Sequence, residues 1–280
     1  MVDLHATSEA NRSRLPAAGF PALRITLPAA PVRVSVVIPT LNEADNLPHV
    51  LPRIPVCVDE VIIVDGHSTD DTVGVAKQLR PDARIVLQNR RGKGNALACG
   101  FAAATGDILV MLDADGSTDP EEIPLFLQPL LRGADFVKGS RFVRGGGSDD
   151  ITRLRSAGNR VLGGAVNLLF GTRYTDLCYG YNAFWRDCLP GLHITCDGFE
   201  VETVLNVRAA KLGFEVAEVP SRERERISGA SNLNARRDGW RVLKTILRER
   251  VTQLPKPTDA WHPEYDEVVS IGREPLPLAA

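Results

Sequence analysis

Short apolar runs, mostly of β-branched residues, recur along the first half of the chain and alternate with segments of helical apolar spacing. The runs predict strands at Val34–Ile38, Glu60–Val64, Ala83–Leu87 and Ile108–Leu112. Between them the pattern predicts helices from about Ala44, at Thr69–Leu79 and at Gly94–Ala104. Strands that alternate with helices form parallel βαβ units. We therefore expect an α/β fold with a mostly parallel central sheet and helices on both faces.

The second half of the chain carries longer helical patterns. Residues Thr152–Phe170 and Val201–Leu212 predict helices, and short strands are predicted at Ala134–Val137 and Glu215–Val219. The last predicted helix is Ala235–Val251, in which an apolar stripe at helical spacing shares the segment with basic residues. Such a basic amphipathic helix is typical of proteins that contact a membrane surface.

Both ends of the chain depart from these patterns. Residues 1–31 are rich in Ala, Pro, Ser and Arg without a sustained period, and prolines interrupt residues 253–280. We expect loose tails at both ends and one domain over residues 32–252.

Charge and composition limit the kinds of partner and compartment that we expect for the protein. The formal net charge is only −2, so nothing global indicates nucleic acid, and any anion site is expected to be local. The 5 cysteines form no Cys-x-x-Cys pair, which argues against a zinc site or disulfide framework and favours a reducing cytoplasm. No window reaches the ~18 apolar residues of a membrane span. We expect a cytoplasmic protein that is at most peripheral at the inner face of the membrane.

The most informative segment is the acidic pair Asp113 and Asp115, which follows the apolar run 108–112 directly. Two carboxylates at the tip of a buried strand can hold a divalent cation together with a diphosphate. A helix cap is the alternative. An EF-hand calcium loop would need further ligands that the segment lacks.

Two polar clusters follow the first two predicted strands, where ligands of α/β sheets bind. Asn42 and Glu43 come just after Pro39 and either cap the next helix or meet a ligand. Asp65 ends the second strand, where its carboxylate can accept hydrogen bonds from a ribose or a base, or serve the local turn.

Two basic clusters follow later strands. The glycine-rich segment 89–96, which contains Lys93, favours phosphate at a helix N-terminus. Arg141 follows the strand at Ala134–Val137 and is suited to grip a phosphate. Arg153 and Arg155 either serve a second anionic group or form a solvated charged face.

In this order the segments resemble the inverting glycosyltransferases of the GT-A fold, closest to the dolichol- or polyprenyl-phosphate mannosyltransferase branch. The resemblance spans about 34 to 250 and is carried by six ordered motifs. They are Val-Ile-Pro-Thr-Leu-Asn-Glu at 37–43, Val-Asp-Gly-His-Ser-Thr-Asp at 64–70, Gly-Lys-Gly-Asn-Ala at 92–96, Asp-Ala-Asp at 113–115, Gly-Ser-Arg-Phe at 139–142 and Arg-Ile-Ser-Gly-Ala-Ser at 226–231.

The resemblance implies a metal-dependent, inverting transfer of a sugar from a nucleoside-diphosphate sugar to a polyprenyl phosphate. Transfer to a soluble hydroxyl acceptor, a nucleotide-sugar-binding protein and a nucleotidyltransferase are the alternatives. The residues expected at the donor are Pro39, Leu41, Glu43, Val64, Asp65, Lys93, Asp113, Ala114, Asp115, Arg141 and Arg226.

The resemblance also implies chemical roles. Asp113 and Asp115 are expected to hold Mg²⁺ or Mn²⁺, with Asp115 the nearer ligand. Catalytic roles fall to Asp115, Arg141 and Glu200, with Glu202 as the alternative base for a hydroxyl acceptor. An acceptor phosphate is already anionic and needs no base.

Two departures from the family pattern leave the sugar and base of the donor open. The family often reads Asp-Asp-Gly-Ser where residues 65–68 read Asp-Gly-His-Ser, so one carboxylate near the nucleoside is absent. Asn232 stands where the family usually has a basic residue.

Overall fold

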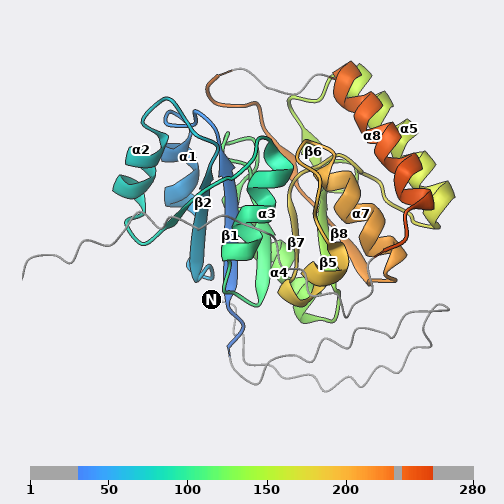
Figure 1. Cartoon of the computed structure of the whole chain (residues 1–280), viewed down its shortest axis with the longest axis horizontal. Helices are drawn as coiled ribbons and strands as arrows, with labels where there is room; N and C mark the ends of the chain where they lie inside the picture. Colours follow the sequence, from blue (N-terminus) through green and yellow to red (C-terminus); the bar gives the residue numbers. More distant parts are fainter. Residues whose placement is uncertain (1–30, 230–234, 255–280) are drawn as a thin grey trace, which may run out of the picture.

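The computed structural model describes residues 31–229 and 235–254. Its centre is a seven-stranded sheet (Figure 1). Across the sheet the strands follow the order β3 (Arg84–Leu87), β2 (Glu60–Asp65), β1 (Val34–Thr40), β4 (Ile108–Met111), β7 (Asn182–Trp185), β5 (Phe136–Ser140) and β8 (Val216–Pro220). A second, two-stranded sheet pairs β6 (Gly147–Ser148) with β9 (Arg222–Glu223).

The direction of the strands confirms the expected mostly parallel α/β sheet. β1 runs parallel to β2 and β4, β2 runs parallel to β3, and β5 runs parallel to β8. β7 is the exception, because it lies antiparallel between β4 and β5. The sequence analysis did not predict this strand, since its four residues contain no β-branched run.

Helices connect and cover the strands. The α-helices are α1 (Leu47–Val50), α2 (Thr72–Leu79), α3 (Lys93–Ala103), α4 (Ile123–Leu131), α5 (Arg153–Phe170), α6 (Leu189–Leu192), α7 (Val201–Lys211) and α8 (Ala235–Val251). Three short 3₁₀ helices lie at Leu51–Arg53, Pro120–Glu122 and Arg186–Cys188. The prediction missed α4, which carries a proline in its first turn and Pro129 in its interior.

The core divides into two packed clusters. The larger one surrounds the sheet and includes the fully buried Val36, Val37 and Ile38 of β1. The smaller one joins three helices through residues such as Val166 of α5, Val207 of α7 and Val242 of α8. In Figure 1, α8 and α5 lie side by side next to α7, beyond the β8 end of the sheet.

The strand ends position the site. β1 and β2 are paired in parallel up to Thr40 and Asp65, and Asp113 follows β4 on the other side of β1. The carboxyl ends of these strands therefore meet at one edge of the sheet, where ligands of open α/β sheets bind.

Some predictions concern residues outside the described ranges. The predicted tails lie there almost entirely, as do the end of the last motif and Asn232. Within the described ranges, no helix combines the length and apolar character that crossing a bilayer requires.

Candidate functional site

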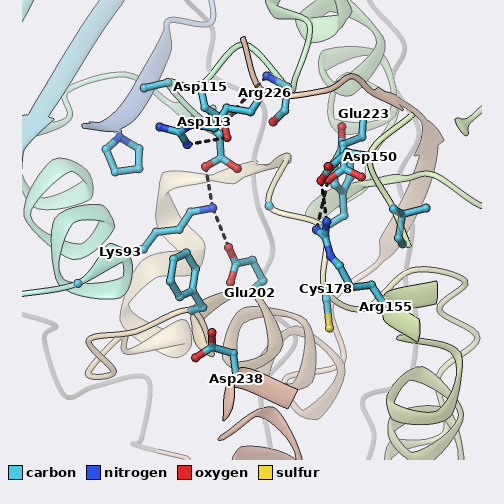
Figure 2. Close-up of a pocket in the computed structure, with 18 of the residues that line it drawn as sticks. Lys93, Asp113, Asp115, Asp150, Arg155, Cys178, Glu202, Glu223, Arg226 and Asp238 are labelled. Carbon is cyan, nitrogen blue, oxygen red and sulfur yellow. Dashed lines mark hydrogen bonds and ion pairs between the residues drawn. The ribbon is translucent and has the colours of Figure 1, made fainter. Parts of the chain in front are cut away.

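A cavity of about 840 Å³ opens at the carboxyl edge of β1 and β4. Its walls also come from the start of α3, from α5 and α8, and from the segment 223–229 (Figure 2). Most residues predicted for the donor line it, namely Pro39, Leu41, Glu43, Lys93, Asp113, Ala114, Asp115, Arg141 and Arg226.

Lys93 links three elements at the charged end of the cavity. Its Nζ lies 2.6 Å from Oδ1 of Asp113 and 2.9 Å from Oε1 of Glu202 (Figure 2). Burial alone would lower the pKa of Lys93, but the two carboxylates outweigh it and raise the pKa well above its ordinary value. Burial raises the pKa of Glu202, and the charge of Lys93 opposes that rise. Lys93 therefore carries its positive charge at neutral pH.

Arg226 forms a second bridge at this end. Its Nη2 lies 2.5 Å from Oε1 of Glu43, and its Nη1 lies 3.2 Å from Oδ2 of Asp115. Burial raises the pKa of Glu43, while hydrogen bonds from Asn46 and Arg226 lower it. The segment around Arg226 is thus tied across the cavity to the end of β1.

The acidic pair fits a divalent cation that also binds a ligand. The side chains of Asp113 and Asp115 remain 29% and 21% exposed, although each has a cationic partner. Among the described residues, no group of three or more His, Cys, Asp or Glu side chains could hold a metal ion. Carboxylate oxygens suit Mg²⁺ and Mn²⁺, which readily take further ligands from phosphate and water. A cation held here would need such ligands.

Arg141 lies in the cavity wall, and its charge is engaged by carboxylates of the protein. Its side chain is 3% exposed, with Nε 2.7 Å from Oδ2 of Asp176 and Nη1 3.0 Å from Oε2 of Glu223. The guanidinium also lies over the ring of Tyr179. Two carboxylates thus neutralise Arg141, so it is not a free phosphate ligand in this arrangement.

Arg155 is the more accessible arginine beside it. Its Nη1 lies 2.6 Å from Oδ2 of Asp150, and its Nη2 lies 3.9 Å from Oε1 of Glu223 (Figure 2). Arg155 lines the cavity, whereas Arg153, two residues earlier, is exposed and does not. The sequence did not decide whether Arg153 and Arg155 serve an anionic group or a solvated face. Of the two, only Arg155 lines the cavity.

Val64 and Asp65 do not line the cavity. Val64 is fully buried in the sheet, because alternate residues of β2 point to opposite faces and both faces are covered. Asp65 is also buried, and its Oδ2 accepts a hydrogen bond from the backbone N of Ser68 at 3.1 Å. Its Oδ1 has no hydrogen-bond partner among the described residues. Gly66 and Gln88 reach the cavity wall beside it.

Glu200, for which a catalytic role was expected, does not line the cavity that holds most of the predicted donor residues. Its carboxylate lies in a separate hollow beside α8, 3.7 Å from Nε of Arg241. Glu202, two residues later, lines the cavity. Glu200 is the N-cap residue of α7 and Glu202 lies in its first turn, and the two side chains line different hollows.

The glycine-rich segment contributes both to the cavity wall, through Gly92 and Lys93, and to contacts inside the protein. The backbone N of Gly94 donates to the carbonyl O of Asp197 at 2.8 Å. A Cβ on Gly92 or Gly94 would lie 2.2 Å from the O of Asp197 or 2.4 Å from the O of Cys196. The amide of Gly94 is therefore already used by Asp197, while the side chain of Lys93 reaches the cavity.

The other end of the cavity is apolar. Ile151, Leu154 and Leu162 line it from in and around α5, Val242 lines it from α8, and Phe199 completes it. The sequence analysis missed these residues, because an apolar position on an amphipathic helix normally signals core. Cys178 also lines the cavity, where desolvation and the charges of Asp176 and Glu202 raise its pKa to about 12.

The chain matches the description Glycosyl transferase family 2 over residues 35–190. It is 33% identical to the glycosyltransferase AglJ of Haloferax volcanii, over 80% of this chain and 74% of that protein. It is 32% identical to the polyprenol monophosphomannose synthase of Mycolicibacterium smegmatis, over 78% of this chain and 89% of that protein.

A solved structure resembles most of the chain. It is the glucosyl-3-phosphoglycerate synthase of Mycobacterium tuberculosis in complex with Mn²⁺, UDP and glucosyl-3-phosphoglycerate. The TM-score is 0.62 at 28% sequence identity, and the match covers 78% of this chain and 80% of that one.

Proposed function

Because the chain belongs to glycosyl transferase family 2, we propose that it transfers a sugar from a nucleoside-diphosphate sugar to a polyprenyl phosphate. One observation carries the proposal: a single cavity joins a charged end around Lys93 to an apolar end between α5 and α8. A nucleoside diphosphate matches the first end, and an isoprenoid chain matches the second. The name of the mycolicibacterial relative, a polyprenol monophosphomannose synthase, supports this acceptor class.

We assign the diphosphate of the donor to the charged end. Asp113 and Asp115 would hold Mg²⁺ or Mn²⁺, and the Mn²⁺ and UDP bound by the similar synthase support this assignment. When bound, the cation neutralises negative charge on the departing diphosphate. Lys93 and Arg226 add two positive charges from the protein. When the donor binds, the guanidinium of Arg226 releases a carboxylate partner and pairs with the phosphate instead.

The acceptor phosphate is assigned to the boundary between the two ends. Arg155 lies there with a partly exposed guanidinium, and Arg141 behind it holds Glu223 in place. The acceptor oxygen attacks the anomeric carbon, the new C–O bond forms, and the bond from that carbon to the diphosphate oxygen breaks. The diphosphate leaves with the electron pair, and attack from the opposite face inverts the carbon. Positioning and electrostatics lower the barrier.

Transfer to a soluble hydroxyl acceptor is the second candidate. It is favoured by Glu202, a buried carboxylate in the cavity wall whose pKa is raised. Such a group is suited to remove a proton from an attacking hydroxyl. The similar synthase is itself bound to a glycosylated phosphoglycerate.

A labelled-donor assay separates these candidates. The full chain is incubated with GDP- and UDP-sugars, with Mg²⁺ or Mn²⁺, and with either a polyprenyl phosphate or 3-phosphoglycerate. We expect label in the lipid extract, dependent on the cation and on polyprenyl phosphate. Label only in a water-soluble product would favour the hydroxyl acceptor, and no product from any donor would contradict both.

A further inference from the structure

Exposed apolar side chains gather on two neighbouring helices. Of the 11 large hydrophobic residues exposed in the described ranges, 6 lie on α5 and α8, with exposed fractions of 56% to 86%. They are Leu154, Val161 and Leu168 on α5, and Trp240, Leu247 and Val251 on α8. Spacings of seven and four residues put each set along one face of its helix. We call these six residues and the cations around them the α5–α8 surface.

The α5–α8 surface is the outer side of a packed helix layer. Val166 of α5, Val207 of α7 and Val242 and Ile246 of α8 share one buried cluster. The apolar stripes lie on the opposite faces of α5 and α8, away from this cluster. Figure 1 shows the two helices together at the edge of the molecule, away from β1–β3. The described chain does not cover these stripes.

The exposed charges carried by α5 and α8 themselves have one sign. α5 contains no acidic residue, and its Arg153 and Arg160 are exposed. The acidic residues of α8, Asp238 and Glu249, are buried at 4% and 0% exposure. Among the side chains described on the two helices, every exposed charge is therefore a cation, although the whole chain has a formal net charge of −2.

Several of these cations line a hollow of about 560 Å³ on the outside of α8. They are Arg237, Arg241, Lys244 and Arg248, and the hollow also holds the carboxylate of Glu200, 3.7 Å from Nε of Arg241. Lys244 lies over the exposed ring of Trp240, with Nζ 5.4 Å from the ring centroid. Lys244 and Arg248 form no ion pair with any carboxylate of the described residues. Tryptophan beside basic side chains is the composition of a membrane interface, where the ring lies at headgroup level and the cations bind lipid phosphates.

We propose that the α5–α8 surface lies on a membrane that contains anionic phospholipids, with their headgroup phosphates in the hollow of α8. The apolar stripes then enter the boundary between headgroups and acyl chains, and the cations meet the negative surface potential. A symmetric dimer through the same surface would bring two cationic faces together, which opposes association.

The apolar end of the cavity and the α5–α8 surface share one residue. Leu154 lines the cavity and is also an exposed member of that surface, whereas Val242 lines the cavity from the buried side of α8. A lipid acceptor could then pass from the bilayer into the cavity without crossing water. This last step rests on the proposed function, whereas the binding of phospholipid does not.

Vesicle co-sedimentation tests the surface alone. The full chain is mixed with phosphatidylcholine vesicles, with or without about a third phosphatidylglycerol, and no polyprenyl phosphate is present. We expect sedimentation with the anionic vesicles, weakened by salt. Changing Lys244→Glu and Arg248→Glu together should lower the partition coefficient about tenfold or more. Val161→Glu with Leu168→Glu should lower it similarly.

A control variant, the melting temperature and the turnover rate distinguish loss of vesicle binding from loss of folding and from loss of activity. Val56→Glu changes an exposed valine outside the two helices and should leave vesicle binding unchanged. All variants should keep the melting temperature and the turnover of a short-chain, water-soluble isoprenyl phosphate. A wild-type chain that stays in the supernatant with anionic vesicles would overturn the inference, as would full binding by both double variants. Dimerisation in sedimentation velocity that Val161→Glu abolishes would also overturn it, in favour of a second copy.

Discussion

The two ends of the cavity are built by different structural means. At the charged end, Glu43 and Asp113 follow β1 and β4, whose pairing fixes where they lie. At the apolar end, Leu154 and Val242 come from α5 and α8, which hold their places through side-chain packing. The groups proposed for the donor are thus held mainly by the sheet, and those proposed for the acceptor by a helix layer. Glu202 of α7 links the two, because it pairs with Lys93 at the charged end.

The largest effect should come from Asp115 at the charged end. Asp115→Asn keeps the shape of the side chain but removes the charge that meets Arg226 and the proposed cation. We expect kcat/KM to fall about 10³-fold, because electrostatic stabilisation of the leaving group is lost. Steady-state assays with Mn²⁺ measure this, and Asp82→Asn, an exposed partner of Arg80, is the control. If Asp115→Asn turns over substrate at the wild-type rate, the acidic pair is not part of the active site.

The next largest effect should come from the contact between Gly92, just before α3, and Asp197, in the loop before α7. Gly92 has a φ of 106° and its Cβ position is 2.2 Å from the O of Asp197, so Gly92→Ala adds both strain and a clash. We expect the free energy of unfolding to fall by about 3 kcal/mol. Gly133 has nearly the same φ, 105°, with nothing within 4 Å, so Gly133→Ala should cost only about 1 kcal/mol. Denaturant unfolding compares them, and equal losses would show that the contact with Asp197 contributes nothing.

A smaller effect should separate the acceptor from the donor. Arg155→Gln removes a cation from the cavity wall, and we expect the KM for a short-chain isoprenyl phosphate to rise about tenfold. The KM for the donor should stay unchanged. Arg153→Gln is the matched control, because Arg153 lies on the same helix but outside the cavity. A change in the donor KM instead would put Arg155 at the charged end.

The smallest effect is a pH dependence of labelling at Cys178. Its pKa is raised to about 12, and the thiolate is the reactive form, so alkylation must be slow at neutral pH and accelerate as pH rises. At pH 8 nearly all of the thiol is therefore protonated, and the rate should still be rising with pH above pH 9. Mass spectrometry after iodoacetamide treatment measures the rate. A rate that levels off near pH 9 would mean an ordinary thiol.

The sequence alone predicted the charged end better than the apolar end. The acidic pair was recognisable because an apolar strand stops abruptly in two carboxylates, which is a local pattern. The partners of Arg141 were not recognisable, since Asp176 and Glu223 lie 35 and 82 residues away along the chain. Glu200 and Glu202 could not be separated either, because the choice depends on where α7 begins and how it packs.

The elements of the fold also differed in how well the sequence predicted them. Alternating strands and helices near the N-terminus obey a simple periodicity, and all four predicted strands there are present within a few residues. β7 and α4 escaped prediction because the first is a short run without β-branched residues and the second carries prolines. Their identity depends on neighbours that the local pattern does not contain.

The hydrogen bond from Gly94 to Asp197 has a consequence for protein engineering. It fastens the start of α3, which carries Lys93, to the loop before α7, which carries Glu202. A chimera that takes its first half from this chain and its acceptor half from a relative would divide this contact between two parents. Such a chimera should keep the two glycines and the loop 195–198 from the same parent, or its lysine and glutamate will no longer meet.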